Sequence, residues 1–196
     1  MIRAYFNEKA TIWDETVAEK DTTKLERLAE SLDIEPGSAL LDVGTGTGVF
    51  VPYLLKRIGG RGRLVTLDFA EEMLKRTRAK NCNENIECLH ADVTNIPLRD
   101  EIFDIVVCYS SFPHFQDKPK SLNEISRVLK KDARLAICHT SSRAAINDIH
   151  RHIPAVQNDI IPGEGEMQTM LSMAGFGGIT ICDNGDNYLA SARKSR

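Results

Sequence analysis

The residues best suited to chemistry form one short run, in which the acid Asp42 is followed at alternate positions by Gly44, Gly46 and Gly48. Glycines let a backbone turn sharply and approach a ligand closely. An acid two residues before the first glycine would repel a pyrophosphate, whereas it would attract an ammonium group. The run therefore indicates a binding turn for a ligand that carries positive charge.

A buried strand and a helix must position this turn. Residues 39–43 are apolar and follow Pro36-Gly37, which is typical of a parallel strand covered on both faces. Apolar residues then recur at helical spacing over residues 49–58, and Pro52 falls in the first helical turn, where it is tolerated. The glycines thus lie between the carboxyl end of a strand and the amino end of a helix, where free N–H groups point at a ligand.

The pattern Asp-x-Gly-x-Gly-x-Gly resembles the first motif of the class I S-adenosylmethionine-dependent methyltransferases. A nicotinamide-dependent oxidoreductase is disfavoured, because its fingerprint needs glycine at the position of Val49. The resemblance covers essentially the whole chain and is greatest to small-molecule enzymes of the ubiquinone and menaquinone biosynthesis type. It implies S-adenosyl-L-methionine as cofactor, with Asp42 helping to hold the amino group and with the methionine and ribose portions contacting Gly44, Thr45, Gly46 and Gly48.

Two further acids extend the resemblance. Asp68 ends a second expected strand, over residues 63–68, in the region where nucleotide-binding folds place an acid for the ribose hydroxyls. The family likeness places Phe69 against the adenine ring. It also implies that Asp92, after a third strand, accepts a hydrogen bond from the adenine amino group, and that the Val93 N–H reaches a ring nitrogen.

The acceptor side carries weaker signals. Methyl transfer is an in-line displacement on an activated carbon, so a base is useful only where the acceptor must lose a proton. We predict that the ends of the fourth and fifth strands meet at one rim, which makes His114, His139 and Tyr109 the candidate catalytic residues. Tyr109 and Ser110 are also candidate cofactor contacts. The histidines of residues 150–152 do not have a recognised ligand spacing, so we predict no metal site.

We expect an α/β, Rossmann-like, doubly wound sheet of seven strands in the order 3-2-1-4-5-7-6, with strand 7 antiparallel. Residues 1–196 should form a single domain. Its first part, residues 1–20, contains Tyr5, Phe6 and Trp13. This segment is interpreted as a lid over the cofactor; the alternative is an amphipathic helix that packs on the sheet.

Two positions depart from the pattern of the family. Ala70 stands where relatives often have a serine that caps the following helix, so that cap is expected to be missing. Residues 131–133 replace a Pro-Gly-Gly turn before a fifth strand predicted over residues 134–139. That turn is expected to use Asp132 or a different geometry.

Composition limits the possible partners. A net charge of −3 and a pI near 6.0 argue against a general nucleic-acid-binding surface. The sequence has no apolar run long enough to span a membrane and no signal-peptide pattern, so we expect a cytoplasmic protein. A small-molecule acceptor is the expected substrate. A catalytically inactive cofactor-binding protein that regulates or assists a partner remains the alternative, and the sequence does not determine the oligomeric state.

Overall fold

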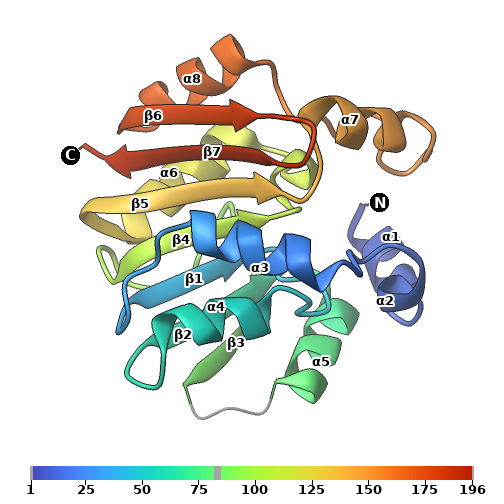
Figure 1. Ribbon diagram of the computed structural model, residues 1–196, viewed down its shortest axis with the longest axis horizontal. Coiled ribbons are helices and arrows are strands. Elements are labelled where there is room, and N and C mark those ends of the chain that lie inside the picture. The colour runs from blue at the N-terminus through green and yellow to red at the C-terminus, as the bar shows by residue number, and fades with distance from the viewer. Residues whose placement is uncertain (1, 82–84, 196) are drawn as a thin grey trace.

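The computed structural model describes residues 2–81 and 85–195. It contains one seven-stranded sheet with the order β3-β2-β1-β4-β5-β7-β6 (Figure 1). Strands β1 to β5 pair in parallel, whereas β7 is antiparallel to both β5 and β6. The predicted strand order and the antiparallel last strand are therefore confirmed. The strands are β1 Ala39–Val43, β2 Arg63–Asp68, β3 Ile86–His90, β4 Phe103–Tyr109, β5 Leu129–His139, β6 Phe176–Asp183 and β7 Tyr188–Lys194.

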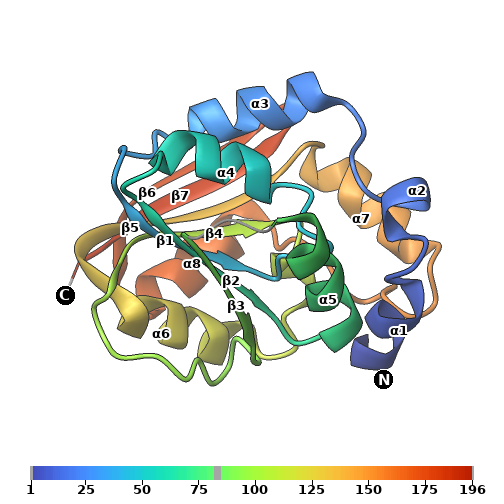
Figure 2. The ribbon, with the colours of Figure 1, turned by 90° about the horizontal axis from the view of Figure 1, so that it is seen from below.

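Helices cover both faces of the sheet, as the apolar character of its strands requires. Helices α3 and α4 pack on one face and α6 and α8 on the other (Figure 2). Successive residues of a strand serve opposite faces: Leu40 packs with α3 and α4, and Leu41 with α6 and α8. The helices are α1 Ile2–Lys9, α2 Trp13–Thr16, α3 Thr22–Ser31, α4 Val51–Ile58, α5 Glu71–Lys80, the 3₁₀ helix η1 Phe112–His114, α6 Lys118–Val128, α7 Arg143–Arg151 and α8 Glu164–Met173.

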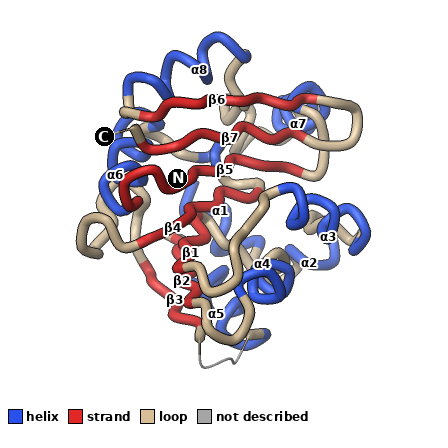
Figure 3. Tube along the Cα trace, turned by 60° about the vertical axis from the view of Figure 1, so that its left-hand side comes forward, coloured by secondary structure: helices blue, strands red, loops and turns tan. Residues whose placement is uncertain are grey.

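The carboxyl ends of the parallel strands all lie at one end of the sheet. Figure 3 shows the twisted strands in red between the helices. Helices α1, α2 and α7 gather at this end, on the right in Figures 1 and 2. Within the described residues, no helix has the length and apolar character needed to cross a bilayer.

The two departures from the family pattern have physical solutions. Ala70 makes no side-chain cap for α5; instead, the Asn7 side chain of α1 accepts a hydrogen bond from the Glu72 N–H at 3.0 Å. Strand β5 starts at Leu129, five residues earlier than predicted, and its exposed polar residues 130–132 lie where the pairing with β4 shifts register, between Leu129 and Arg134. Asp132 nevertheless has a left-handed φ of 60°, beside an irregularity in the pairing of β4 with β5.

Candidate active site

A cavity of about 350 Å³ lies at the carboxyl ends of the parallel strands. Its walls bring together residues from the glycine turn, β2, the loop after β3, the end of β4 and η1. Of the candidate site residues, the cavity is lined by Gly44, Thr45, Gly46, Asp68, Phe69, Asp92, Val93, Tyr109, Ser110 and His114. The candidates that do not line it are Asp42, Gly48 and His139.

All three glycines of the turn have left-handed φ angles, but the space that a side chain would enter differs between them. A Cβ on Gly44 would lie 2.4 Å from the Cβ of Ser111, and one on Gly48 would lie 3.0 Å from Oγ1 of Thr77. Protein atoms therefore require glycine at these two positions. A Cβ on Gly46 would meet nothing within 4 Å, although Gly46 lines the cavity. The space beside Gly46 is open to a ligand, as a cofactor cradle requires.

Asp68 fixes the turn and still faces the cavity. Its Oδ2 accepts a hydrogen bond from the Gly46 N–H at 2.8 Å, and its Oδ1 accepts one from the Ala70 N–H at 2.7 Å. Burial raises the pKa of Asp68 to about 6, against the effect of these two hydrogen bonds. Each carboxylate oxygen can accept a further hydrogen bond, so the group can serve two adjacent hydroxyls at neutral pH.

Asp42 lies in β1, just before the turn, and is only 2% exposed. Burial raises its pKa to about 7, the Thr45 hydroxyl opposes this shift, and the charge of Asp68 adds to it. Because Asp42 does not line the cavity, it can act on a ligand ammonium only through the intervening turn. Its predicted role in holding the amino group stays a prediction.

Asp42→Asn should stabilise the ligand-free protein at pH 8. A carboxyl whose pKa is raised on folding binds more protons in the folded state, so it lowers stability progressively as pH rises from about 4 to about 7. A shift of three units corresponds to a gain of at most about 4 kcal/mol for the neutral amide. Chemical denaturation at pH 5 and pH 8 measures the difference between the variant and the wild type. An equal difference at both pH values would contradict the assignment.

The adenine end of the predicted site is a tight turn. Asp92 Oδ1 accepts hydrogen bonds from the N–H and the hydroxyl of Thr94, at 2.8 and 2.7 Å. Both bonds use one oxygen, which leaves the acceptor capacity of the other. Val93 and Phe69 add apolar surface to the same wall. The arrangement has the acceptor and the apolar contacts that a purine needs, and the roles of these residues stay predictions.

The amino-terminal segment closes one side of the cavity. Phe6 of α1 and Trp13 of α2 line it, and the Phe6 ring lies 5.9 Å from that of Phe69 and 5.0 Å from that of His114. Helix α1 packs against α5. The segment thus lies beside the cavity and not against the sheet, which favours the interpretation as a lid; its movement stays a prediction.

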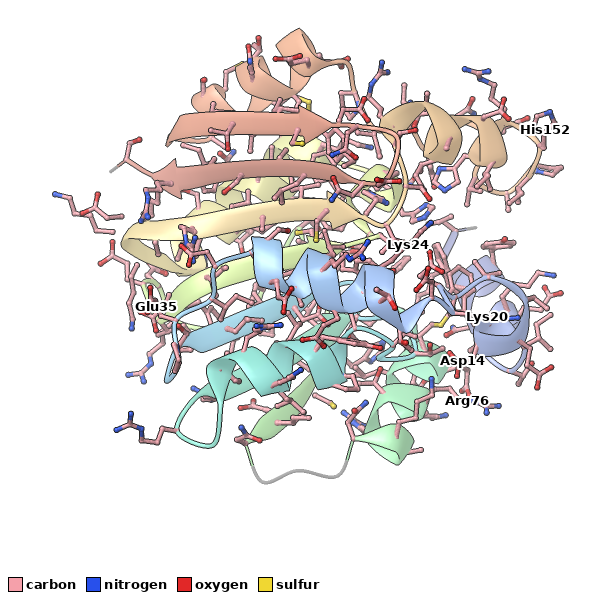
Figure 4. All side chains as sticks on the ribbon, viewed as in Figure 1. Asp14, Lys20, Lys24, Glu35, Arg76 and His152 are labelled. Carbon is pink, nitrogen blue, oxygen red and sulfur yellow. The ribbon has the colours of Figure 1, made fainter. Side chains whose placement is uncertain are left out.

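Asp14 fastens this segment to the glycine turn. Its Oδ1 accepts a 2.5 Å hydrogen bond from the Thr47 hydroxyl, and its Oδ2 pairs with Lys80 of α5. Arg76 lies nearby (Figure 4). Burial opposes the negative charge of Asp14, yet the hydrogen bonds from Lys80 and Thr47 hold its pKa below the usual value.

Tyr109 and His114 are the two catalytic candidates that reach the cavity. The Tyr109 ring stacks on Phe50 at 4.4 Å, and burial raises the pKa of Tyr109 to about 12. Tyr109 therefore holds its proton at neutral pH, and its catalytic role stays a prediction. His114 is hydrogen-bonded through Nδ1 to Oδ2 of Asp159 at 2.9 Å.

The expectation that His139 joins them at one rim is wrong. Only 1% of His139 is exposed, and its ring lies 6.2 Å from that of Tyr188, the residue opposite it on β7. Neither ring nitrogen has a hydrogen-bond partner among residues 2–81 and 85–195. Burial lowers the pKa of His139 to about 3, so the side chain is a neutral core group.

Sequence reasoning missed Asp159, Asn7 and Asp14. They lie on the loop after α7 and on the amino-terminal segment, and no motif marked them. Among the residues that the structure describes, no group of three or more histidine, cysteine, aspartate or glutamate side chains has a geometry suited to a metal ion.

Comparison with known proteins finds relatives among the methyltransferases. Residues 41–137 match the family described as a methyltransferase domain. The chain is 34% identical over 116 residues to a demethylmenaquinone methyltransferase of Lactobacillus johnsonii, covering 57% of this chain and 48% of that protein. It is 30% identical over 135 residues to the methyltransferase GfsG of Streptomyces halstedii, covering 68% and 49% respectively. The matches thus span about half the length of these relatives.

Solved structures extend the similarity over the full chain. A SAM-dependent methyltransferase from Aquifex aeolicus superposes with a TM-score of 0.77 and 26% identity, covering 96% of this chain and 98% of that one. A Thermotoga maritima protein, described as a SAM-dependent and possible histamine N-methyltransferase, gives 0.80 over the whole of both chains at 16% identity, which supports the fold alone. The expected Rossmann-like fold is confirmed.

Proposed function

The chain belongs to the class I S-adenosylmethionine-dependent methyltransferases, and from this premise we propose that it transfers a methyl group from S-adenosyl-L-methionine to a small-molecule acceptor. One observation carries the proposal: the open space beside Gly46 adjoins the buried Asp68 carboxylate. The Gly46 N–H donates a 2.8 Å hydrogen bond to this carboxylate, which fixes the position of the turn relative to Asp68. A turn that a ligand can approach and an acceptor for two hydroxyls thus share one cavity.

The residues present fit this cofactor. The turn would hold the methionine portion, Asp68 the ribose, and Asp92 with Val93 the adenine. When bound, the cofactor supplies a methyl carbon activated by a sulfonium. Phe6 and Trp13 line the cavity and exclude water from it. An in-line displacement needs the protein to align the reactants and to keep water out.

A small acceptor is supported by the walls of the cavity. Phe6, Tyr109 and Phe115 give it an aromatic side next to His114. Some relatives are named as demethylmenaquinone methyltransferases, which suits an aromatic acceptor. We therefore place the acceptor in the part of the cavity between the amino-terminal segment and η1.

Asp68→Ala should weaken binding of S-adenosylhomocysteine by about 1.5 to 3 kcal/mol, the range for hydrogen bonds to a charged group. The cause is loss of the ribose acceptor together with the clamp on Gly46. Isothermal titration calorimetry measures the change. Asp186→Ala, which removes an exposed acid from the β6–β7 hairpin, is the matched control and should bind as wild type does. Equal affinity of the Asp68 variant and the control would remove Asp68 from the site.

Release of S-adenosylhomocysteine distinguishes the enzyme from a binding protein without activity. We expect turnover when S-adenosylmethionine is supplied with an acceptor, and mass spectrometry should find one added methyl group on the acceptor. Tight cofactor binding with no product from a broad acceptor panel would favour the inactive alternative.

A further inference from the structure

His114 is held by a carboxylate at the acceptor side of the cavity. The side chains of His114 and Asp159 are each 14% exposed, and Nδ1 of the first lies 2.9 Å from Oδ2 of the second. The carboxylate can only accept a hydrogen bond, so Nδ1 of His114 carries the proton. In a neutral ring, Nε2 is then the unprotonated nitrogen and can receive a proton.

Asp159 also fixes a second imidazole. Nδ1 of His150 contacts the backbone carbonyl of Asp159, which likewise can only accept, so His150 has the same tautomer. The rings of His114 and His150 lie 4.9 Å apart. One residue thus orients both rings, by its side chain and by its backbone.

The loop that carries Asp159 is itself held in place. Asn147 is the buried residue of α7, and its amide group forms two hydrogen bonds with the backbone of Ile161. Asn147 Nδ2 donates to the Ile161 carbonyl at 3.0 Å, and the Ile161 N–H donates to Oδ1 at 2.8 Å. This pair fixes the chain two residues from Asp159, so the carboxylate has a defined position.

The surroundings single out His114 from the neighbouring imidazoles. Burial lowers the pKa of His139 to about 3, and it also lowers that of His150, against the effect of the Asp159 carbonyl. The other charges that face the cluster are Lys118 of α6, near Asp159, and Glu166 of α8, near Lys118. Of the three rings, His114 is the one that lines the cavity and has a carboxylate to stabilise an imidazolium.

We propose that Nε2 of His114 removes the proton of the methyl acceptor, that Asp159 is the positioning residue for this base, and that the acceptor reacts through an O–H, N–H or S–H group. The inference rests on the proposed methyl transfer. The acceptor's proton passes to Nε2 of His114, and the electron pair of its heteroatom forms the bond to the methyl carbon. The carbon–sulfur bond breaks, and its electron pair stays on sulfur as a neutral thioether. The imidazolium, paired with Asp159, then releases its proton to water.

The test compares four variants with three probe acceptors, namely phenol, thiophenol and benzylamine. His114→Gln removes the base and Asp159→Asn removes the charge that positions it, while Asp159→Glu retains that charge. His152→Gln is the matched control, because His152 is exposed and lies at the outer end of α7, away from the amino-terminal segment (Figure 4). Product formation is measured at saturating S-adenosylmethionine, and cofactor affinity is measured by calorimetry.

With phenol at pH 7 we expect kcat to fall about 100-fold or more in His114→Gln and about 10-fold in Asp159→Asn, the scale of general-base catalysis. Asp159→Glu should recover part of the loss, and His152→Gln should equal wild type. With phenol, kcat of His114→Gln should rise with pH as the acceptor ionises by itself, which loss of packing would not produce. Affinity for S-adenosylhomocysteine should stay within about twofold of wild type in all four variants.

A second measurement does not depend on turnover. Long-range ¹⁵N NMR of the ligand-free protein should find His114 and His150 protonated at Nδ1 and unprotonated at Nε2. In Asp159→Asn, His114 should lose this single tautomer, whereas His150, which is held by the backbone carbonyl, should keep it.

Unchanged kcat in both His114→Gln and Asp159→Asn would overturn the proposal, as would an Nε2-protonated His114. Cofactor binding by the wild type without methylation of any of the three probes would overturn the assignment of the acceptor class. Absence of cofactor binding by the wild type would instead contradict the proposed function itself.

Discussion

Gly46→Val is expected to weaken binding of S-adenosylmethionine at least about 100-fold, or roughly 2.8 kcal/mol. The side chain would enter the open space on the cavity side of the turn. The backbone cannot move away easily, because the Gly46 N–H is bonded to Asp68 and the Gly46 carbonyl accepts a 2.8 Å hydrogen bond from the Thr77 hydroxyl. Calorimetry with S-adenosylhomocysteine measures the loss.

Gly37→Val is the matched control for backbone strain. Gly37 also has a left-handed φ, of 90°, and open space around it, but it lies in the turn before β1 and does not line the cavity. Both variants should lose about 1 to 2 kcal/mol of folding stability from strain. Only Gly46→Val should lose the cofactor. Normal binding by Gly46→Val would mean that the glycine turn is not the cradle.

Removal of residues 1–20 should leave a folded protein that has lost most of its methyl transfer, by about 100-fold or more. Phe6 belongs to a small apolar cluster with Ala70 and Met73 of the α5 region, separate from the two clusters that cover the sheet. The sheet therefore keeps its packing without this segment. The cavity loses Phe6 and Trp13, which exclude water and confine the acceptor.

Thermal unfolding and release of S-adenosylhomocysteine compare the truncated chain with the full one. Trp13 is the only tryptophan, so its fluorescence in the full chain reports this segment alone. Cofactor should shift that emission and protect residues 1–20 from protease. Full activity of the truncated chain, or fluorescence unaffected by saturating cofactor, would show that the segment is ordinary packing.

The strands were predictable because their signals are local. Residues 63–68 form a short, mostly apolar run that follows a glycine-rich turn, and β2 has the predicted limits. The start of β5 was not predictable in this way. Lys130, Lys131 and Asp132 give no apolar alternation, and none of them has a partner in the pairing of β5 with β4.

The site residues also fall into two groups: those in local motifs could be predicted from the sequence, and those that depend on distant contacts could not. Gly46 and Asp68 lie in motifs at strand ends, where a parallel sheet necessarily brings them together. The partners found only in the structure act across the sequence: Asp14 and Thr47 are 33 residues apart, and His114 and Asp159 are 45 apart. His139 was misplaced because a strand end alone does not tell which way its side chain points.

The Asn7 cap makes the start of α5 depend on the position of the amino-terminal segment. Its hydrogen bond to Glu72 exists only while α1 lies on α5, and a cap contributes about 1 kcal/mol, or a factor of about five in an equilibrium constant. The capped turn directly follows Phe69 and Asp68. Any free energy by which closure of the segment strengthens cofactor binding at Asp68 is matched by the free energy with which the bound cofactor favours closure, because a coupling between two sites is reciprocal.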